Sequence, residues 1–109
     1  MRAMVLCVGL AGGLNGNDGA TVAIQTFKYG PKTLEVAVGT SVTWTNGDEI
    51  EHTVSAGIPE HPDSLFDHAL PTKGSTYEFT FARPGTFTYF CARHPFMRGE
   101  IRVVPKGDK

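Results

Sequence analysis

Short runs in which apolar and polar residues alternate constrain the fold of this chain more than any other feature. In the segment 33–38 (TLEVAV), Leu34, Val36 and Val38 alternate with small or polar residues, and in 76–81 (TYEFTF) the alternating positions are all aromatic. Because successive side chains of an extended chain point to opposite faces, a period of two indicates half-buried strands. The pattern predicts strands at 20–27, 33–38, 41–46, 52–55, 76–81, 85–91 and 100–104.

Turn-forming residues separate these predicted strands. Four pairs fall between consecutive runs: Gly30-Pro31, Gly39-Thr40, Asn46-Gly47 and Pro84-Gly85. No stretch has a helical period, and only the segment 56–75 is expected to be irregular, with a short helical turn inside it. Seven short strands within 109 residues indicate one all-β domain, either a sandwich or a small barrel.

The charge of the chain is nearly balanced but unevenly placed. Its net charge is −1 and it has no polybasic run, which gives no support to nucleic-acid binding. The segment 33–72 contains no lysine or arginine, whereas most charged residues from Lys73 onward are basic. This asymmetry is typical of a solvated surface, and it also fits a dipolar surface that orients a partner.

The first residues form a separate region. Arg2, the apolar run 3–10 and the small residues around Ala11 resemble a minimal secretory signal, which is too short to span a bilayer. An ordinary first strand or a disordered tail is the alternative. We therefore expect residues 1–19 to be a tail or the remnant of a signal, and the protein to be periplasmic or otherwise extracytoplasmic. The two cysteines, Cys7 and Cys91, do not by their number settle whether they pair.

Three residues that bind soft metals follow an aromatic-rich predicted strand. Cys91, His94 and Met97 are spaced three residues apart in the stretch YFCARHPFMRG. The side chain of Cys91 lies on the apolar face of its strand and is expected to point into the core. Because Pro95 and Gly99 break a strand, His94 and Met97 are expected in a loop that folds back over the end of the sandwich.

A metal bound there needs another strong ligand, and the chain has four histidines: His52, His61, His68 and His94. His52 begins a predicted strand and so also lies at an end of the sandwich. Two imidazoles and a thiolate, with a weak thioether, make up an electron-transfer copper site. Zinc takes a fourth N, S or O donor, and a catalytic Cys–His pair needs an exposed thiol. His61 and His68 are expected to be solvated loop residues rather than ligands.

Two long segments resemble the cupredoxins, the small blue copper proteins, and in particular short-loop members such as amicyanin. They are TLEVAVGTSVTWTNGDEIEHTVSA and YEFTFARPGTFTYFCARHPFMRGEIRVV. The pattern C-x-x-H-x-x-M is weak alone but specific together with D-x-x-x-H-T-V and P-G-T-F-x-Y-x-C upstream. The resemblance implies a cupredoxin-like Greek-key β-sandwich of about seven to eight strands at residues 20–105, followed by a short tail at 106–109.

The resemblance also implies roles for single residues. The four implied ligands of one copper ion are His52, Cys91, His94 and, as the axial thioether, Met97. Thr53 stands where several relatives carry an asparagine that supports the thiolate loop, and its backbone N–H is expected to donate to the Cys91 sulfur. Pro95 has no N–H and cannot supply a second such bond.

The implied function is that of a small soluble carrier that shuttles single electrons between redox protein partners and converts no substrate. Electrons are expected to pass through a port formed by His94, Pro95 and Phe96, which Arg93 and Arg98 flank. Phe90, next to Cys91, offers a second route. The carrier is expected to be a monomer without a transmembrane segment.

Three other functions stay open at this point. A periplasmic copper chaperone or store would favour open sites rich in Met and His, whereas the candidate ligands here fit one closed site. A copper enzyme would need a second copper centre, and the chain has no H-x-H pair. A metal-free sandwich that acts as a binding module is the third alternative.

Overall fold

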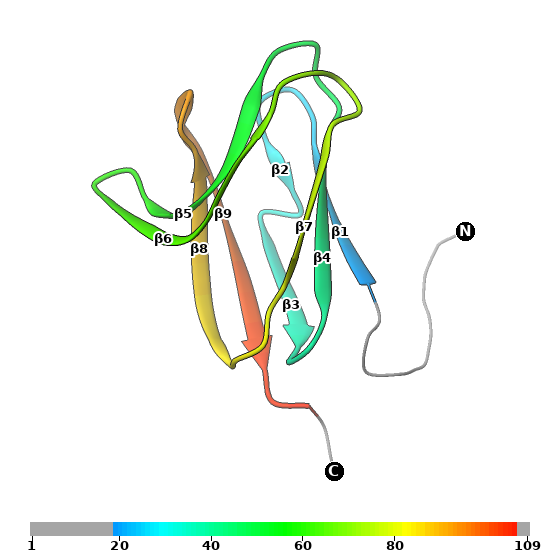
Figure 1. Ribbon diagram of the computed structural model, residues 1–109, viewed down its shortest axis with the longest axis vertical. Helices are drawn as coiled ribbons and strands as arrows, with labels where there is room; N and C mark the ends of the chain where they lie inside the picture. Colours follow the sequence, from blue (N-terminus) through cyan, green and yellow to red (C-terminus); the bar gives the residue numbers. More distant parts are fainter. Residues whose placement is uncertain (1–18, 107–109) are drawn as a thin grey trace.

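The computed structural model describes residues 19–106, which form two packed sheets (Figure 1). The strands of this part of the chain are β1 (Gly19–Ile24), β2 (Tyr29–Gly30), β3 (Thr33–Ala37), β4 (Ser41–Asn46), β5 (His52–Ile58), β6 (His61–Leu70), β7 (Thr76–Thr80), β8 (Gly85–Cys91) and β9 (His94–Val104). The all-β sandwich is confirmed, with nine strands in this range rather than seven or eight. No helix within residues 19–106 is long and apolar enough to cross a membrane.

One sheet has four strands in the order β2-β1-β4-β7, and the other has five in the order β3-β9-β8-β5-β6. The pairs β1–β4 and β3–β9 are parallel, and the remaining pairs are antiparallel. In the five-stranded sheet, β8 and β9 are inner strands. Cys91 and His94 therefore lie on inner strands, although β9 is paired on both sides only from Glu100 onward.

The core lies between the two sheets and contains the apolar residues of the alternating pattern. Val42 and Trp44 on β4 are fully buried, whereas Ser41 and Thr43, the residues that precede each of them, are not. Trp44 contacts the rings of Tyr77 and Tyr89, which come from the two different sheets. On β4, the apolar positions of the alternating pattern are therefore the ones that face the core.

The expectation of an irregular segment at 56–75 with a helical turn is wrong. Residues His61–Leu70 form β6, an edge strand that pairs antiparallel with β5. Gly57 has a φ of 99°, and a Cβ atom there would lie 2.6 Å from the backbone of β6, so the register shift between the strands requires glycine. Only Phe66 and Leu70 of β6 are buried, which explains why the strand lacks an alternating pattern.

The expectation that His94 and Met97 lie in a loop is also wrong. Only Ala92 and Arg93 form the turn, and both His94 and Met97 belong to β9. Strand β3 pairs with β9 only from Glu100 onward, so the missing N–H of Pro95 breaks no bond to β3. A proline is tolerated there because it precedes the part of β9 that is paired on both sides.

The first strand ends earlier than its sequence pattern predicts. β1 ends at Ile24 rather than at Phe27, because Thr26 and Phe27 have positive φ values of 54° and 60°. The expected tail or signal remnant at 1–19 lies outside the described residues except for Gly19, as does Cys7. The expected tail at 106–109 also lies outside them except for Lys106.

Candidate metal centre

Three donor side chains meet at one end of the five-stranded sheet. Each of His52, Cys91 and His94 offers one ligand atom, and these atoms all lie within 4.8 Å of one another. The Cys91 Sγ atom is 3.7 Å from His52 Nδ1 and 3.6 Å from His94 Nδ1. His52 and Cys91 are completely buried, and His94 is partly exposed. The structure thus brings together the histidine and thiolate donors expected from the sequence.

The local backbone explains why Cys91 and His94 are close. Cys91 ends β8, His94 begins β9, and the two residues are paired across the Ala92–Arg93 turn. His52 is the first residue of β5 and reaches the same place from a separate part of the chain. Cys91 is a free thiol, as the metal-site interpretation requires.

The imidazole of His52 is held in one orientation by Asp48. Its Nε2 atom lies 2.9 Å from Asp48 Oδ2, so Nε2–H donates to the carboxylate and leaves the Nδ1 lone pair facing Cys91. The same carboxylate accepts hydrogen bonds from the amides of Thr26 at 2.8 Å and Phe27 at 3.0 Å. Asp48 therefore fixes both the histidine and the loop in which the φ values are positive.

The hydrogen bonds also affect the ionisation of this carboxyl. Partial burial by itself raises the pKa of Asp48, but the amides of Phe27 and Thr26 and the side chain of His52 outweigh it and lower the pKa below its ordinary value. The carboxylate is thus kept in the charged form that accepts from His52.

Sequence reasoning gave no role to Asp48, although Asp48 begins the motif D-x-x-x-H-T-V, and it missed Phe27. The usable signal for Asp48 is its position four residues before His52, just after the Asn46-Gly47 turn. Asn46 Oδ1 accepts the amide of Asp48 at 2.8 Å, which places the carboxylate. Phe27 packs at the surface end of the site, with its ring centroid 5.4 Å from His52 and 4.9 Å from His94. No sequence pattern singles out Phe27.

Thr53 supports the thiol as the sequence comparison implied. Its backbone N–H lies 3.3 Å from Cys91 Sγ, which confirms the expected N–H···S bond. Its Oγ1 atom accepts the amide of Ala92, in the turn after Cys91, at 2.7 Å. Pro95 supplies no such donor, and its carbonyl oxygen accepts from Arg98 Nε at 3.2 Å.

Tyr29 supports Thr53 from the core side. Its hydroxyl donates to the Thr53 carbonyl oxygen at 2.7 Å, and burial raises the pKa of this phenol, so the proton stays on it. Thr53 is therefore bonded through its carbonyl, its amide and its hydroxyl. The residue beside the thiol has little freedom to move.

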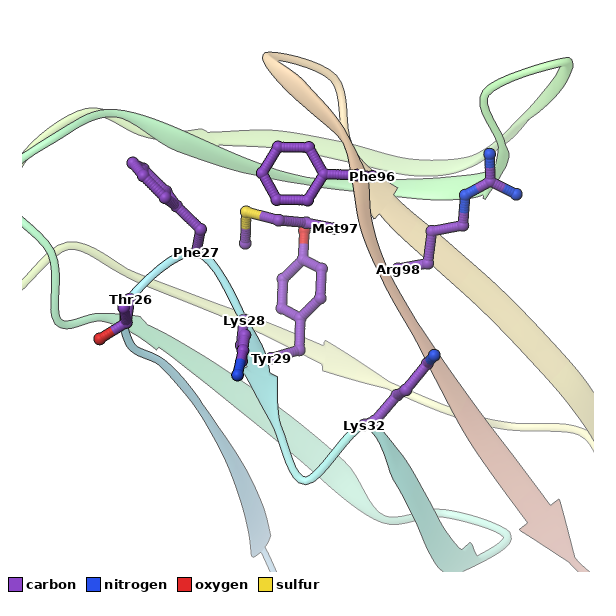
Figure 2. Close-up of a pocket in the computed structure, with 8 residues that line it drawn as sticks. All are labelled: Thr26, Phe27, Lys28, Tyr29, Lys32, Phe96, Met97 and Arg98. Carbon is purple, nitrogen blue, oxygen red and sulfur yellow. The ribbon is translucent and has the colours of Figure 1, made fainter.

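Met97 lies on β9 with only 2% of its surface exposed. Figure 2 shows its side chain extending from β9 in the direction of Phe27. It lines a groove of about 540 Å³, whose other lining residues are Thr26, Phe27, Lys28, Tyr29, Lys32, Phe96 and Arg98. Phe96 is 71% exposed, so the neighbourhood of His94 presents a large apolar side chain to solvent.

The other two histidines stay apart from this cluster. His61 and His68 lie on β6 and are exposed, and neither belongs to the donor group found within residues 19–106. The ring of His68 stacks on Tyr77 at 4.5 Å. They are solvated as expected, although on a strand rather than in a loop.

The donor set fits copper. Imidazole nitrogens and a thiolate, with a thioether carried on the adjoining strand, are ligands that copper accepts in electron-transfer sites. The three residues that meet include no carboxylate, because Asp48 is engaged with the far side of the His52 ring. A closed structural zinc site would need a fourth N, S or O donor at this point.

The sequence matches those of known copper-binding proteins. Residues 17–104 match the family model described as copper binding proteins, plastocyanin/azurin family. The chain is 34% identical to amicyanin of Paracoccus versutus and 37% identical to amicyanin of Paracoccus denitrificans, each over 79% of its length. It spans just under two thirds of those relatives, 65% and 66% of their lengths.

Solved structures resemble the fold as a whole. A purple cupredoxin from Nitrosopumilus maritimus superposes with a TM-score of 0.72 at 29% identity, covering 78% of this chain and 99% of the other. The crystal structure of amicyanin from Paracoccus versutus gives a TM-score of 0.70 at 32% identity, covering 80% and 82% of the two chains.

Proposed function

The chain belongs to the plastocyanin/azurin family of copper-binding proteins, and we propose that it is a one-electron carrier with a single copper site. The proposed ligands are His52, Cys91, His94 and, as a weak axial donor, Met97. The observation that carries the proposal is the convergence of two imidazole nitrogens on a buried thiol that already accepts an N–H bond. Copper bound there would supply a couple between Cu(I) and Cu(II).

The surrounding residues hold the donors in place before any metal binds. Asp48 fixes His52, the Thr53 amide donates to Cys91, and the two-residue turn sets His94 against Cys91. A site whose donors are already held needs little rearrangement when its charge changes, which favours fast electron transfer. The same rigidity disfavours a chaperone, which must release its cargo.

We assign the electron port to His94, Pro95 and Phe96. His94 is the only partly exposed member of the donor group described above, and Phe27 and Phe96 pack around its ring. An apolar surface of this kind suits short-lived redox encounters, which bury little area. Phe90 is only 6% exposed, so it is less accessible as a second exit.

Charged side chains border this apolar surface. Arg93 pairs with Glu51 at 3.3 Å and Arg98 with Glu60 at 3.4 Å. Lys28 and Lys32 line the groove beside Met97 and Phe96 (Figure 2) and have no carboxylate partner within residues 19–106. We propose redox protein partners for this face, with a carrier that acts as a monomer and converts no substrate.

The location and domain limits are proposed on the sequence alone. The signal-like composition of residues 2–11 supports a periplasmic or otherwise extracytoplasmic location. We assign residues 20–105 to the copper-binding domain, a range that overlaps most of the family match at 17–104. Residues 1–19 and 106–109 would then be flanking tails.

The test is reconstitution with Cu(II), followed by visible spectroscopy and a metal titration. We expect an intense thiolate-to-copper absorption that saturates at one copper per chain, and copper that a chelator removes slowly. A colourless copper complex would overturn the proposed site. Rapid loss of copper to the chelator would instead favour a chaperone or store.

A further inference from the structure

A chain of hydrogen bonds connects the turn beside Cys91 to an exposed carboxylate on the edge strand. The Ala92 amide donates to Thr53 Oγ1 at 2.7 Å, Thr53 Oγ1 lies 2.9 Å from Ser55 Oγ, and Ser55 Oγ lies 2.8 Å from Asp67 Oδ1. Thr53 and Ser55 on β5 are buried, with 8% and 5% of their surfaces exposed, whereas Asp67 on β6 is exposed. The chain thus runs from the β8–β9 turn, through β5, to β6.

The two ends of this chain fix the direction of every bond in it. An amide N–H only donates and a carboxylate only accepts, and each hydroxyl has a single hydrogen to give. Ser55 must therefore donate its single hydrogen to Asp67, so Thr53 must donate to Ser55. Both hydroxyl hydrogens point away from the thiol, and the contact from Thr53 to the sulfur comes from its backbone amide.

We propose that Asp67 is a positioning residue for the metal centre. Through Ser55 and Thr53 it anchors the Ala92 amide, and so it holds the turn that sets His94 against Cys91. Without an acceptor at position 67, the buried Ser55 hydroxyl loses its partner and the direction of both hydroxyls is no longer determined. The proposed effect of Asp67 on the metal rests on the proposed copper site. The proposed effect of Asp67 on the β8–β9 turn does not require copper.

Asp63 provides a matched control. It is an exposed carboxylate on the same strand, and it lines the same surface hollow of about 330 Å³ as Asp67, Ala92 and Pro95. Its carboxylate accepts the amide of Leu65 at 3.0 Å and takes no part in the chain of hydroxyls. Replacement of Asp63 removes a nearby negative charge but leaves the series of hydrogen bonds from Asp67 to Ala92 intact. The comparison therefore separates the effect of charge alone from the effect of the hydrogen bonds.

The experiment compares amide hydrogen exchange in the full chain, first without metal and then in the diamagnetic Cu(I) form. Asp67→Ala and Ser55→Ala should speed exchange of the Ala92 amide on the order of tenfold, as expected for a weakened hydrogen bond. Asp67→Asn keeps an acceptor oxygen and should restore slow exchange. Asp63→Ala should leave it unchanged, and the Phe81 amide, which donates to Thr40, serves as an internal reference in every variant.

The reduction potential gives the second readout. The reduction potential of Asp67→Ala should differ from that of Asp67→Asn, whereas Asp63→Ala and Asp63→Asn should have equal potentials. Only the acceptor at position 67 is connected to the β8–β9 turn, because the Asp63 carboxylate accepts from Leu65. Unchanged Ala92 exchange in Asp67→Ala, or an Asp67→Asn variant that behaves like Asp67→Ala, would overturn the proposal. The wild-type spectrum with Cu(II) tests the copper site separately. Failure of the proposed copper site is therefore distinguishable from failure of the proposed role of Asp67.

Discussion

The amide of Thr53 donates to the sulfur of Cys91 across 3.3 Å, although the two residues are 38 positions apart in the chain. This bond joins the start of β5 to the end of β8. The bond fixes the position of the sulfur, which is one of the proposed metal donors. Removal of the sulfur should therefore affect the metal far more than the fold.

Replacing Cys91 tests the assignment of the thiolate. Cys91→Ser should abolish the intense visible absorption of the Cu(II) protein and keep the β-sheet circular dichroism. Because the hydroxyl still accepts from Thr53, the cost in unfolding free energy should be only about 1–2 kcal/mol. A Cys91→Ser protein with undiminished colour would contradict the assignment.

Replacing Asp48 tests the fixation of His52. Asp48→Ala leaves the imidazole Nε2–H and the amides of Thr26 and Phe27 without their acceptor, so copper affinity should fall about 10–100-fold. Competition with a chelator of known affinity measures the change. Glu49→Ala is the control, since Glu49 is exposed and, among the described residues, pairs only with Lys73 at 3.6 Å. Equal losses of affinity in both variants would count against a specific role for Asp48.

Two buried tyrosines that contact each other should respond differently to loss of their hydroxyls. Tyr29 and Tyr89 pack edge to face at 4.6 Å, but only Tyr29 donates a hydrogen bond, and Tyr89 Oη has no partner within residues 19–106. Tyr29→Phe should cost about 1–2 kcal/mol because the Thr53 carbonyl loses its donor. Tyr89→Phe should be neutral or stabilising. Denaturant unfolding measures both, and a larger loss in Tyr89→Phe would reverse the argument.

Replacing Met97 tests its role as an axial ligand. Met97→Leu keeps a buried side chain of similar volume and removes a weak donor, so copper should stay bound. The reduction potential should rise, because a weaker axial donor stabilises Cu(II) less. For a one-electron couple, each tenfold change in the ratio of Cu(II) affinity to Cu(I) affinity shifts the potential by about 59 mV. Voltammetry of the two proteins decides it, and complete loss of copper would show that Met97 holds the metal rather than tunes it.

Replacing Phe96 separates the port from the site. Because Phe96 is 71% exposed and offers no donor atom, Phe96→Ala should leave the spectrum and stability nearly unchanged. Electron transfer to a redox partner should slow by roughly tenfold if the side chain is central to docking. Stopped-flow kinetics at several salt concentrations measures this, with Thr86→Ala on the exposed part of β8 as the control. Unchanged kinetics would direct attention to the Phe90 side.

The alternation of apolar and polar residues predicted the strands that bury one face in the core. It failed to predict a strand in which few residues are buried. β4 alternates because one of its faces is buried. The sequence of β8 alternates too, which allowed Cys91 to be placed in the core, although Phe90 on its other face is also buried. The edge strand β6 buries only Phe66 and Leu70, so its residues carry no such signal and its backbone pairing alone defines it.

The same limit applies to the site. The ligand spacing was open to prediction from local motifs, and the Thr53 bond was implied by the resemblance to the cupredoxins. The role of Asp67 was not open to prediction, because strand pairing between β5 and β6 brings its side chain to Ser55. Asp48 lies only four residues before His52, so its spacing was available in the sequence, but the spacing alone did not show that the carboxylate accepts from the imidazole. The rule that Pro95 ends a strand also failed, since it ignores which neighbour the missing N–H would have faced.

The inner position of β9 has a consequence for biosynthesis. The strand lies between β3 and β8 and carries both His94 and Met97, and it follows all the other described strands in the chain. During translation the five-stranded sheet therefore stays divided until this last strand emerges. A nascent chain that ends before β9 lacks an inner strand of the sheet. It also lacks His94 and Met97, two of the four proposed donors, so it has no complete metal site.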